Sequence, residues 1–220
     1  MNAEIENLYS RWNGLMKGHN KKPKIRNLVF EKLIANYSQK TREYHNLAHL
    51  TDCFKEFDEC EEFIECLDWL ELGLFFHDAV YDTHAKNNEE ESILFMNGLL
   101  LVHLPPYDLC RAGGIILATK HDKIPEYNDE KLAVCIDLAI LGKPWAQYLK
   151  YSEGIRKEYS WVEKSAYCSG RAKVLNSFLN RDKIYPHKFF EDKYEKKARE
   201  NLTSEIGLLR MENLNYYSDW

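Results

Sequence analysis

The chain has 220 residues, 45% of them apolar and 13% aromatic, with only 10 glycines and 6 prolines. This composition supports a substantial buried core and excludes disordered, collagen-like and low-complexity proteins. The net charge of −5 argues against general binding to nucleic-acid backbones or to anionic membranes.

No uninterrupted apolar run reaches the roughly 18 residues that a membrane helix needs. The acidic, polar start MNAEIENLYSRW lacks the features of a secretory signal, so we expect a cytoplasmic protein with no membrane partner. In such a chain the six cysteines are expected to be reduced, and the lack of a C-x-x-C pair argues against a cysteine zinc knuckle.

Helical periodicity dominates the sequence, without a convincing alternating strand or internal repeat, so the predicted fold class is all-α. No linker rich in glycine, serine or proline separates two halves. We therefore predict a single domain over residues 1–220, with a core at about 25–142 and a helical extension at about 143–220. The expected helices cover residues 3–17, 25–38, 45–63, 66–80, 88–103, 107–120, 129–141, 145–159, 161–180 and 188–209.

Several of these helices have recognisable ends. Asn88 is the expected cap of the helix that follows it, and Pro106 and Pro144 suit first turns. The last predicted helix carries a stripe of apolar residues at helical spacing, which indicates an amphipathic helix with one buried face. The stripe consists of Phe190, Tyr194, Ala198, Leu202 and Ile206.

Two histidines four residues apart lie in the segment REYHNLAH. On a helix, His45 and His49 would share one face and reach a common ion. A zinc peptidase would need a glutamate directly after the first histidine, but Asn46 stands there. Two partly exposed histidines with no ligand are the alternative.

Two further segments place charge in apolar surroundings. His77 and Asp78 follow the run LGLFF, and Asp137 lies within AVCIDLAIL. A buried carboxylate must be paired or bound to a metal, which favours ligation over a plain His–Asp pair or a bond to a distant arginine. Two imidazoles and two carboxylates suit Mn²⁺, Fe²⁺, Co²⁺, Ni²⁺ or Zn²⁺ rather than Ca²⁺.

The order of a histidine, a His-Asp pair and a distant aspartate on a helical frame resembles the HD superfamily of metal-dependent phosphohydrolases. More narrowly, RxYHNLxH, FHDAVYD, NNEEES, ATKHD, DLAILG, IRKEY and GRAKVLNSFLNR look like the motifs of a bacterial branch of predicted HD phosphohydrolases, over about residues 40–205. The resemblance implies an HD-domain helical bundle.

Carried over by position, the resemblance implies that His77 and Asp78 are paired metal ligands and that Asp137 is the final ligand. In cyclic-nucleotide phosphodiesterases the similar YHNxxH motif uses its first histidine as proton donor and its second as ligand. This implies His45 as the donor and His49 as the ligand, with His45 as the alternative ligand.

The segment HDAVYDT also resembles the HDxxEDT motif of guanosine-tetraphosphate hydrolases, with Tyr81 in place of the first acid. Asp82 matches the second acid and is predicted to align the attacking water, an exposed helix-end aspartate being the alternative. For substrate binding we predict Arg42, His121 and Arg156, because cationic side chains complement phosphate oxygens. A second ion or a plain turn are alternatives for His121, and surface charges for the arginines.

The sequence thus predicts a metal-dependent phosphohydrolase that cleaves a phosphoester of a small molecule, such as a nucleotide, through metal-bound hydroxide. The expected cofactor is one divalent ion of Mn, Fe, Co, Ni, Zn or Mg, and the expected partner is a small phosphorylated substrate; homodimer formation is left open. The alternatives are a di-iron HD-type oxygenase, with ligands such as His84, His103 and His121, and a non-catalytic module that binds metal and nucleotide.

Overall fold

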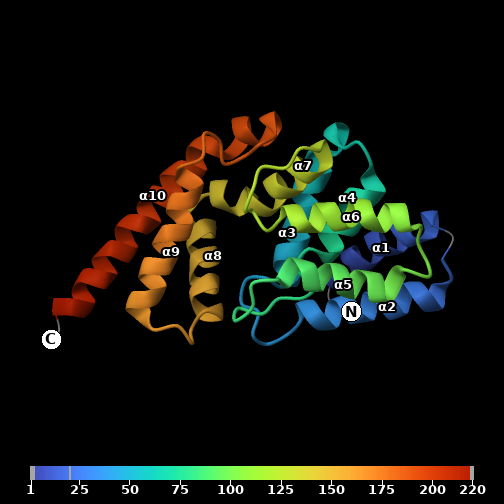
Figure 1. The fold of residues 1–220 in the computed structure, drawn as a ribbon, viewed down its shortest axis with the longest axis horizontal. Helices are drawn as coiled ribbons and strands as arrows, with labels where there is room; N and C mark the ends of the chain where they lie inside the picture. Colours follow the sequence, from blue (N-terminus) through green and yellow to red (C-terminus); the bar gives the residue numbers. More distant parts are fainter. Residues whose placement is uncertain (1–2, 20, 219–220) are drawn as a thin grey trace. The chain divides into compact units, whose positions relative to one another are not determined.

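The computed structural model describes residues 3–19 and 21–218, with side chains described up to residue 211 (Figure 1). Every regular element in these residues is helical, which confirms the predicted all-α class. Within the same residues, none of the helices has both the length and the apolar character needed to cross a bilayer.

The chain divides into two compact units, residues 1–137 and 138–220. The division falls after Asp137, whereas the sequence analysis places the boundary at about residue 142. The first unit contains α1 (Ala3–Gly18), α2 (Pro23–Tyr37), α3 (Leu47–Glu59), η1 (Glu61–Phe63), α4 (Leu67–Phe76), α5 (Asn88–Leu100), α6 (Pro106–Ala118) and α7 (Asn128–Asp137). The second contains η2 (Leu138–Gly142), α8 (Trp145–Glu158), α9 (Lys164–Leu179) and α10 (Lys188–Ser218).

Helix α4 forms the centre of the first unit because it is apolar on nearly every side. It packs against α6, where Gly73 leaves room for the side chain of Ile115. On another side Trp12 of α1 makes edge contacts with Phe75 and Phe76, with ring centroids 5.2 and 6.3 Å apart. The apolar run that precedes His77 is therefore buried, as the sequence indicates.

Helix α3 begins at Leu47, two residues later than predicted. The side chain of Asn46 accepts a hydrogen bond from the backbone N–H of Ala48 at 2.9 Å, so it caps the helix. His45 consequently lies before the helix, and the expectation that it shares a helical face with His49 is wrong. The cap instead places His49 in the first turn of α3.

Helix α4 ends at Phe76, so the predicted helix over 66–80 is too long. Backbone groups beyond this point are bonded by side chains from elsewhere. Arg42 donates to the carbonyl oxygens of Asp78 and Ala79 at 2.6 and 3.1 Å. The Val80 N–H donates to the hydroxyl of Ser92 at 3.0 Å. These bonds replace the helical ones, which leaves His77 and Asp78 in a turn.

Helix α5 has Asn87 at its N-cap position, and the predicted capping residue Asn88 is its first residue. The side chain of Asn88 instead bonds to the backbone of Asp82: it accepts from the N–H and donates to the carbonyl oxygen, both at 3.0 Å. The side chain of Asn88 therefore closes the turn that leads from Asp82 into α5.

The second unit confirms the predicted amphipathic stripe. All five stripe residues of α10 are buried. Helix α10 packs against η2 and α9, and a side chain added at Gly142 would collide with Tyr194. All six cysteines are free thiols; four are buried and Cys110 is exposed.

Candidate metal centre

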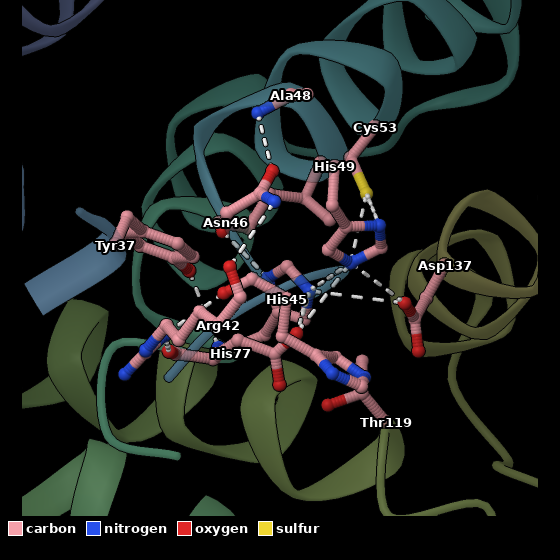
Figure 2. A network of polar contacts seen from close by, with 12 residues as sticks. Tyr37, Arg42, His45, Asn46, Ala48, His49, Cys53, His77, Thr119 and Asp137 are labelled. Carbon is pink, nitrogen blue, oxygen red and sulfur yellow. Dashed lines mark hydrogen bonds and ion pairs between the residues drawn. The ribbon is translucent and has the colours of Figure 1, made fainter. Parts of the chain in front are cut away.

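Three segments of the first unit bring polar side chains to one point (Figure 2). His49 comes from the first turn of α3, and His77 follows the end of α4. Asp137 is the last residue of α7. Together with Cys53 of α3, these side chains form a cluster that could hold a metal ion, with their ligand atoms within 4.8 Å of one another.

The two imidazoles face each other through their Nε2 atoms, which are 3.1 Å apart. At the other side of its ring, the Nδ1 of His77 lies 2.8 Å from the carbonyl oxygen of Leu74. A carbonyl oxygen only accepts, so Nδ1 carries the hydrogen of the neutral ring. The lone pair of the His77 Nε2 is therefore directed into the cluster, as a metal ligand requires.

Two carboxylates approach the same nitrogens. Asp78 Oδ2 lies 3.4 Å from His49 Nε2 and 3.2 Å from His77 Nε2. Asp137 Oδ1 lies 3.2 and 3.8 Å from these two atoms. The structure thus brings together all four side chains that the sequence analysis names as ligands.

The histidines of the cluster stabilise the ionised forms of its two carboxylates. Burial raises the pKa of Asp78, but the imidazoles of His77, His45 and His49 together outweigh burial and hold the pKa well below its usual range. Burial likewise opposes ionisation of Asp137, but hydrogen bonds from His121 and His49 lower its pKa. Both carboxylates are therefore ionised, and they attract a cation.

The cluster opens on its carboxylate side. The side chains of His49 and His77 are 3% and 0% exposed, whereas those of Asp78 and Asp137 are 14% and 17% exposed. Water can therefore reach the carboxylates, while the imidazoles remain enclosed.

Cys53 is the one member of the cluster that sequence reasoning missed. It follows His49 by four residues on α3, and this spacing is the signal that would have revealed it. Its Sγ lies 3.8 Å from Nδ1 and 3.7 Å from Nε2 of His49. Since it is nearly equidistant from both nitrogens, the sulfur lies beside the ring and not along the Nε2 lone pair. Burial raises the pKa of the Cys53 thiol.

His45 lies beside the cluster. Its ring stacks on Tyr81 with centroids 3.9 Å apart and lies edge-on to His49 at 5.8 Å. It is one of the groups whose charge lowers the pKa of Asp78.

Arg42 is buried against the turn after α4, with its guanidinium directed at backbone carbonyl oxygens. It also donates to the carbonyl oxygen of His45 at 3.2 Å. The structure therefore places Arg42 next to the cluster, in bonds that hold the two segments carrying His45 and Asp78.

The remaining predicted residues lie in different surroundings. Asp82 is exposed, and its carboxylate accepts from the N–H of His84 at 2.9 Å within the turn after the site. His121 Nε2 lies 2.7 Å from Asp137 Oδ2. Arg156 belongs to the second unit, where it donates to the carbonyl oxygens of Tyr159 and Val162.

Comparison of the chain with protein-family models, with curated proteins and with solved structures gives no match. The geometry of the cluster is therefore the basis for assigning a function to the chain.

Proposed function

We propose that the chain is a metal-dependent phosphohydrolase of the HD type in which His49, His77, Asp78 and Asp137 hold one divalent ion. The observation that carries this proposal is the set of distances among their ligand atoms. The Nε2 atoms are 3.1 Å apart, and each faces both carboxylates at 3.2 to 3.8 Å. Ligand atoms that lie about 2.0–2.2 Å from a shared ion are separated by such distances.

The chemistry of the donors fits the same ion. The hydrogen on Nδ1 of His77 leaves Nε2 free to ligate, and two ionised carboxylates supply negative charge. Two nitrogen and two oxygen donors suit Mn²⁺, Fe²⁺, Co²⁺, Ni²⁺ or Zn²⁺. Mg²⁺ is the alternative, although it is a harder Lewis acid that prefers oxygen ligands.

Asp78 is a better fourth ligand than Cys53. Its Oδ2 approaches both Nε2 atoms, whereas the sulfur lies beside the His49 ring. A buried thiol with a raised pKa stays protonated at neutral pH and is then a poor ligand. We therefore infer that Cys53 packs beside the His49 ring and does not bind the ion.

Phosphoester hydrolysis needs an activated water, access for the substrate and a proton donor for the departing oxygen. A divalent ion held by His49, His77, Asp78 and Asp137 would lower the pKa of a coordinated water toward about 7 and would polarise a phosphoryl oxygen. The partly exposed carboxylates leave an approach for a small phosphorylated molecule such as a nucleotide.

His45 is the proposed proton donor. Its ring lies outside the set of ligand atoms, which favours His49 over His45 as the ligand. Stacking on Tyr81 holds the imidazole next to the cluster, where it can give a proton to the departing oxygen. The roles of Asp82 in aligning water and of Arg42 and Arg156 in binding phosphate remain predictions.

The proposal is tested by metal analysis of the purified protein together with a screen of phosphomonoesters, nucleotides and cyclic dinucleotides in the presence of Mn²⁺. We expect one divalent ion per chain and turnover of a phosphoester. His77→Ala and Asp137→Asn should lose both the ion and the turnover.

Asp129→Asn is the matched control. Asp129 is another aspartate of α7, and it is buried, but its carboxylate accepts from the N–H groups of Glu65 and Cys66. This variant should lose stability and keep its metal. Turnover that survives in His77→Ala would overturn the proposal. Two irons per chain with consumption of oxygen would favour an oxygenase, and nucleotide binding without turnover would favour a non-catalytic module.

A further inference from the structure

His121 has an unusual backbone. Helix α6 ends at Ala118, and the N–H groups of residues 119, 120 and 121 each donate to the carbonyl oxygen three residues earlier, at 3.2, 3.3 and 3.2 Å. At His121 the chain turns into the left-handed region, with φ at 58°. Among the residues that the structure describes, it is the one non-glycine residue with positive φ.

This position normally favours a different residue. Helices that end in a left-handed residue have glycine there most often, because a side chain strains this conformation. A residue that keeps such strain beside a polar cluster points to a role for its side chain. The side chain of His121 indeed extends to the cluster, where Nε2 lies 2.7 Å from Asp137 Oδ2.

The two oxygens of Asp137 therefore have different partners. Oδ1 faces His49 Nε2 at 3.2 Å, and Oδ2 faces His121 Nε2 at 2.7 Å. The side chains of Asp137 and His121 are 17% and 16% exposed, so the bond lies at the partly exposed edge of the cluster. Because Asp137 is ionised and only accepts, His121 donates through an N–H on Nε2, which a neutral imidazole supplies.

We infer that His121 is a positioning residue, which holds Oδ2 of Asp137 so that Oδ1 alone ligates the ion. This inference rests on the proposed metal site and extends it. Since His121 occupies Oδ2, this oxygen of Asp137 is not available to bridge to a second ion. Nε2 of His121 is bonded to Asp137, so His121 could bind phosphate through Nε2 only by breaking the bond to Asp137.

Three substitutions separate the hydrogen bond from the backbone strain. His121→Gln keeps an N–H donor at about the reach of Nε2, and His121→Ala removes it; both carry a side chain in the left-handed conformation. His121→Gly removes the donor and relieves the strain. For each variant, the affinity for Mn²⁺ or Zn²⁺ is measured by competition with a chelator, the stoichiometry by metal analysis, and the stability of the metal-free protein by thermal unfolding.

We expect His121→Ala and His121→Gly to bind the ion about 10 to 100 times more weakly than the wild type, and His121→Gln to recover most of the affinity. The wild type should bind one ion per chain. Unchanged affinity in His121→Ala and His121→Gly would overturn the inference. It would also be overturned if His121→Gln bound the ion no more tightly than His121→Ala and all three variants lost stability without metal, because His121 would then have a structural role only.

A wild type with two ions that falls to one in His121→Ala would make His121 a ligand and also overturn the inference. Asp137→Asn keeps this failure distinct from failure of the proposed function. If the wild type binds metal, Asp137→Asn loses it and the His121 variants are unchanged, the inference alone fails. If the wild type binds no metal, the proposed function fails with it.

Discussion

His77 shows how one backbone contact prepares a side chain for ligation. The carbonyl oxygen of Leu74 accepts a hydrogen bond from the N–H at Nδ1 of His77, which directs the Nε2 lone pair towards His49 and Asp78. A sequence carries no direct signal for such a tautomer, since it depends on where α4 ends. What could be predicted was the need for a cation, because His77 and Asp78 follow a run of buried apolar residues.

The affinity for metal should rise with pH. Burial lowers the pKa of His77, but the Asp78 and Asp137 carboxylates outweigh it and raise the pKa. Below that raised pKa a proton occupies the imidazole and competes with the ion, so binding strengthens as the pH rises through a window extending above the usual value of about 6.5. Calorimetric titration with Zn²⁺ at several pH values measures this effect, and an affinity that stays constant between about pH 6 and pH 8 would contradict it.

At the scale of elements, the boundaries were harder to predict than the helices. The sequence pattern continues apolar through Ala79 and Val80, so nothing local indicates that α4 stops at Phe76. Side chains of Arg42 and Ser92, distant in sequence, bond the backbone there and end the helix. The distinction between His45 and His49 has a local origin that the sequence did carry: Asn46 is a good capping residue, which places the start of α3 between them.

The cap of α3 should contribute to stability. Asn46→Ala removes the acceptor for the Ala48 N–H and should lower the free energy of unfolding by about 1 kcal/mol, whereas Asn46→Ser keeps a capping oxygen and should cost much less. Urea unfolding of the metal-free proteins measures both. Equal losses in the two variants would mean that the cap does not stabilise the helix.

The close packing of α4 on α6 makes a second prediction. A Cβ at Gly73 would lie 2.3 Å from Cγ2 of Ile115, so Gly73→Ala should destabilise the protein by about 1–3 kcal/mol. Gly98 of α5 has nothing within 4 Å of the added atom, and Gly98→Ala should stabilise by up to about 1 kcal/mol. Thermal and urea unfolding distinguish the two signs; destabilisation of both by the same amount would refute the packing argument.

At the scale of the whole molecule, the second unit has a buried polar network of its own. The second unit buries an ion pair between Arg171 and Glu205, whose side chains are 8% and 4% exposed and 2.9 Å apart. Glu205 also accepts from the hydroxyls of Tyr148 and Ser152. This network joins α8, α9 and α10, and no pattern in the sequence identifies its partners, because they lie 34 to 57 residues apart.

Breaking this network should loosen the second unit. Arg171→Met leaves Glu205 buried without its counter-ion and should cost about 3–5 kcal/mol, whereas the double variant Arg171→Met, Glu205→Leu removes both charges and should recover much of the loss. Hydrogen exchange followed by mass spectrometry should show lost protection in peptides from α8 to α10 of the single variant. Unchanged exchange in those peptides would contradict the assignment.

The central claim is that four side chains from three segments of the first unit hold one ion. Crystals grown with Mn²⁺ and measured for anomalous scattering test it most directly. We expect one anomalous peak per chain, about 2.0–2.3 Å from His49 Nε2, His77 Nε2, Asp78 Oδ2 and Asp137 Oδ1. A map with no peak among these four atoms, or with its peak at another position, would contradict the account.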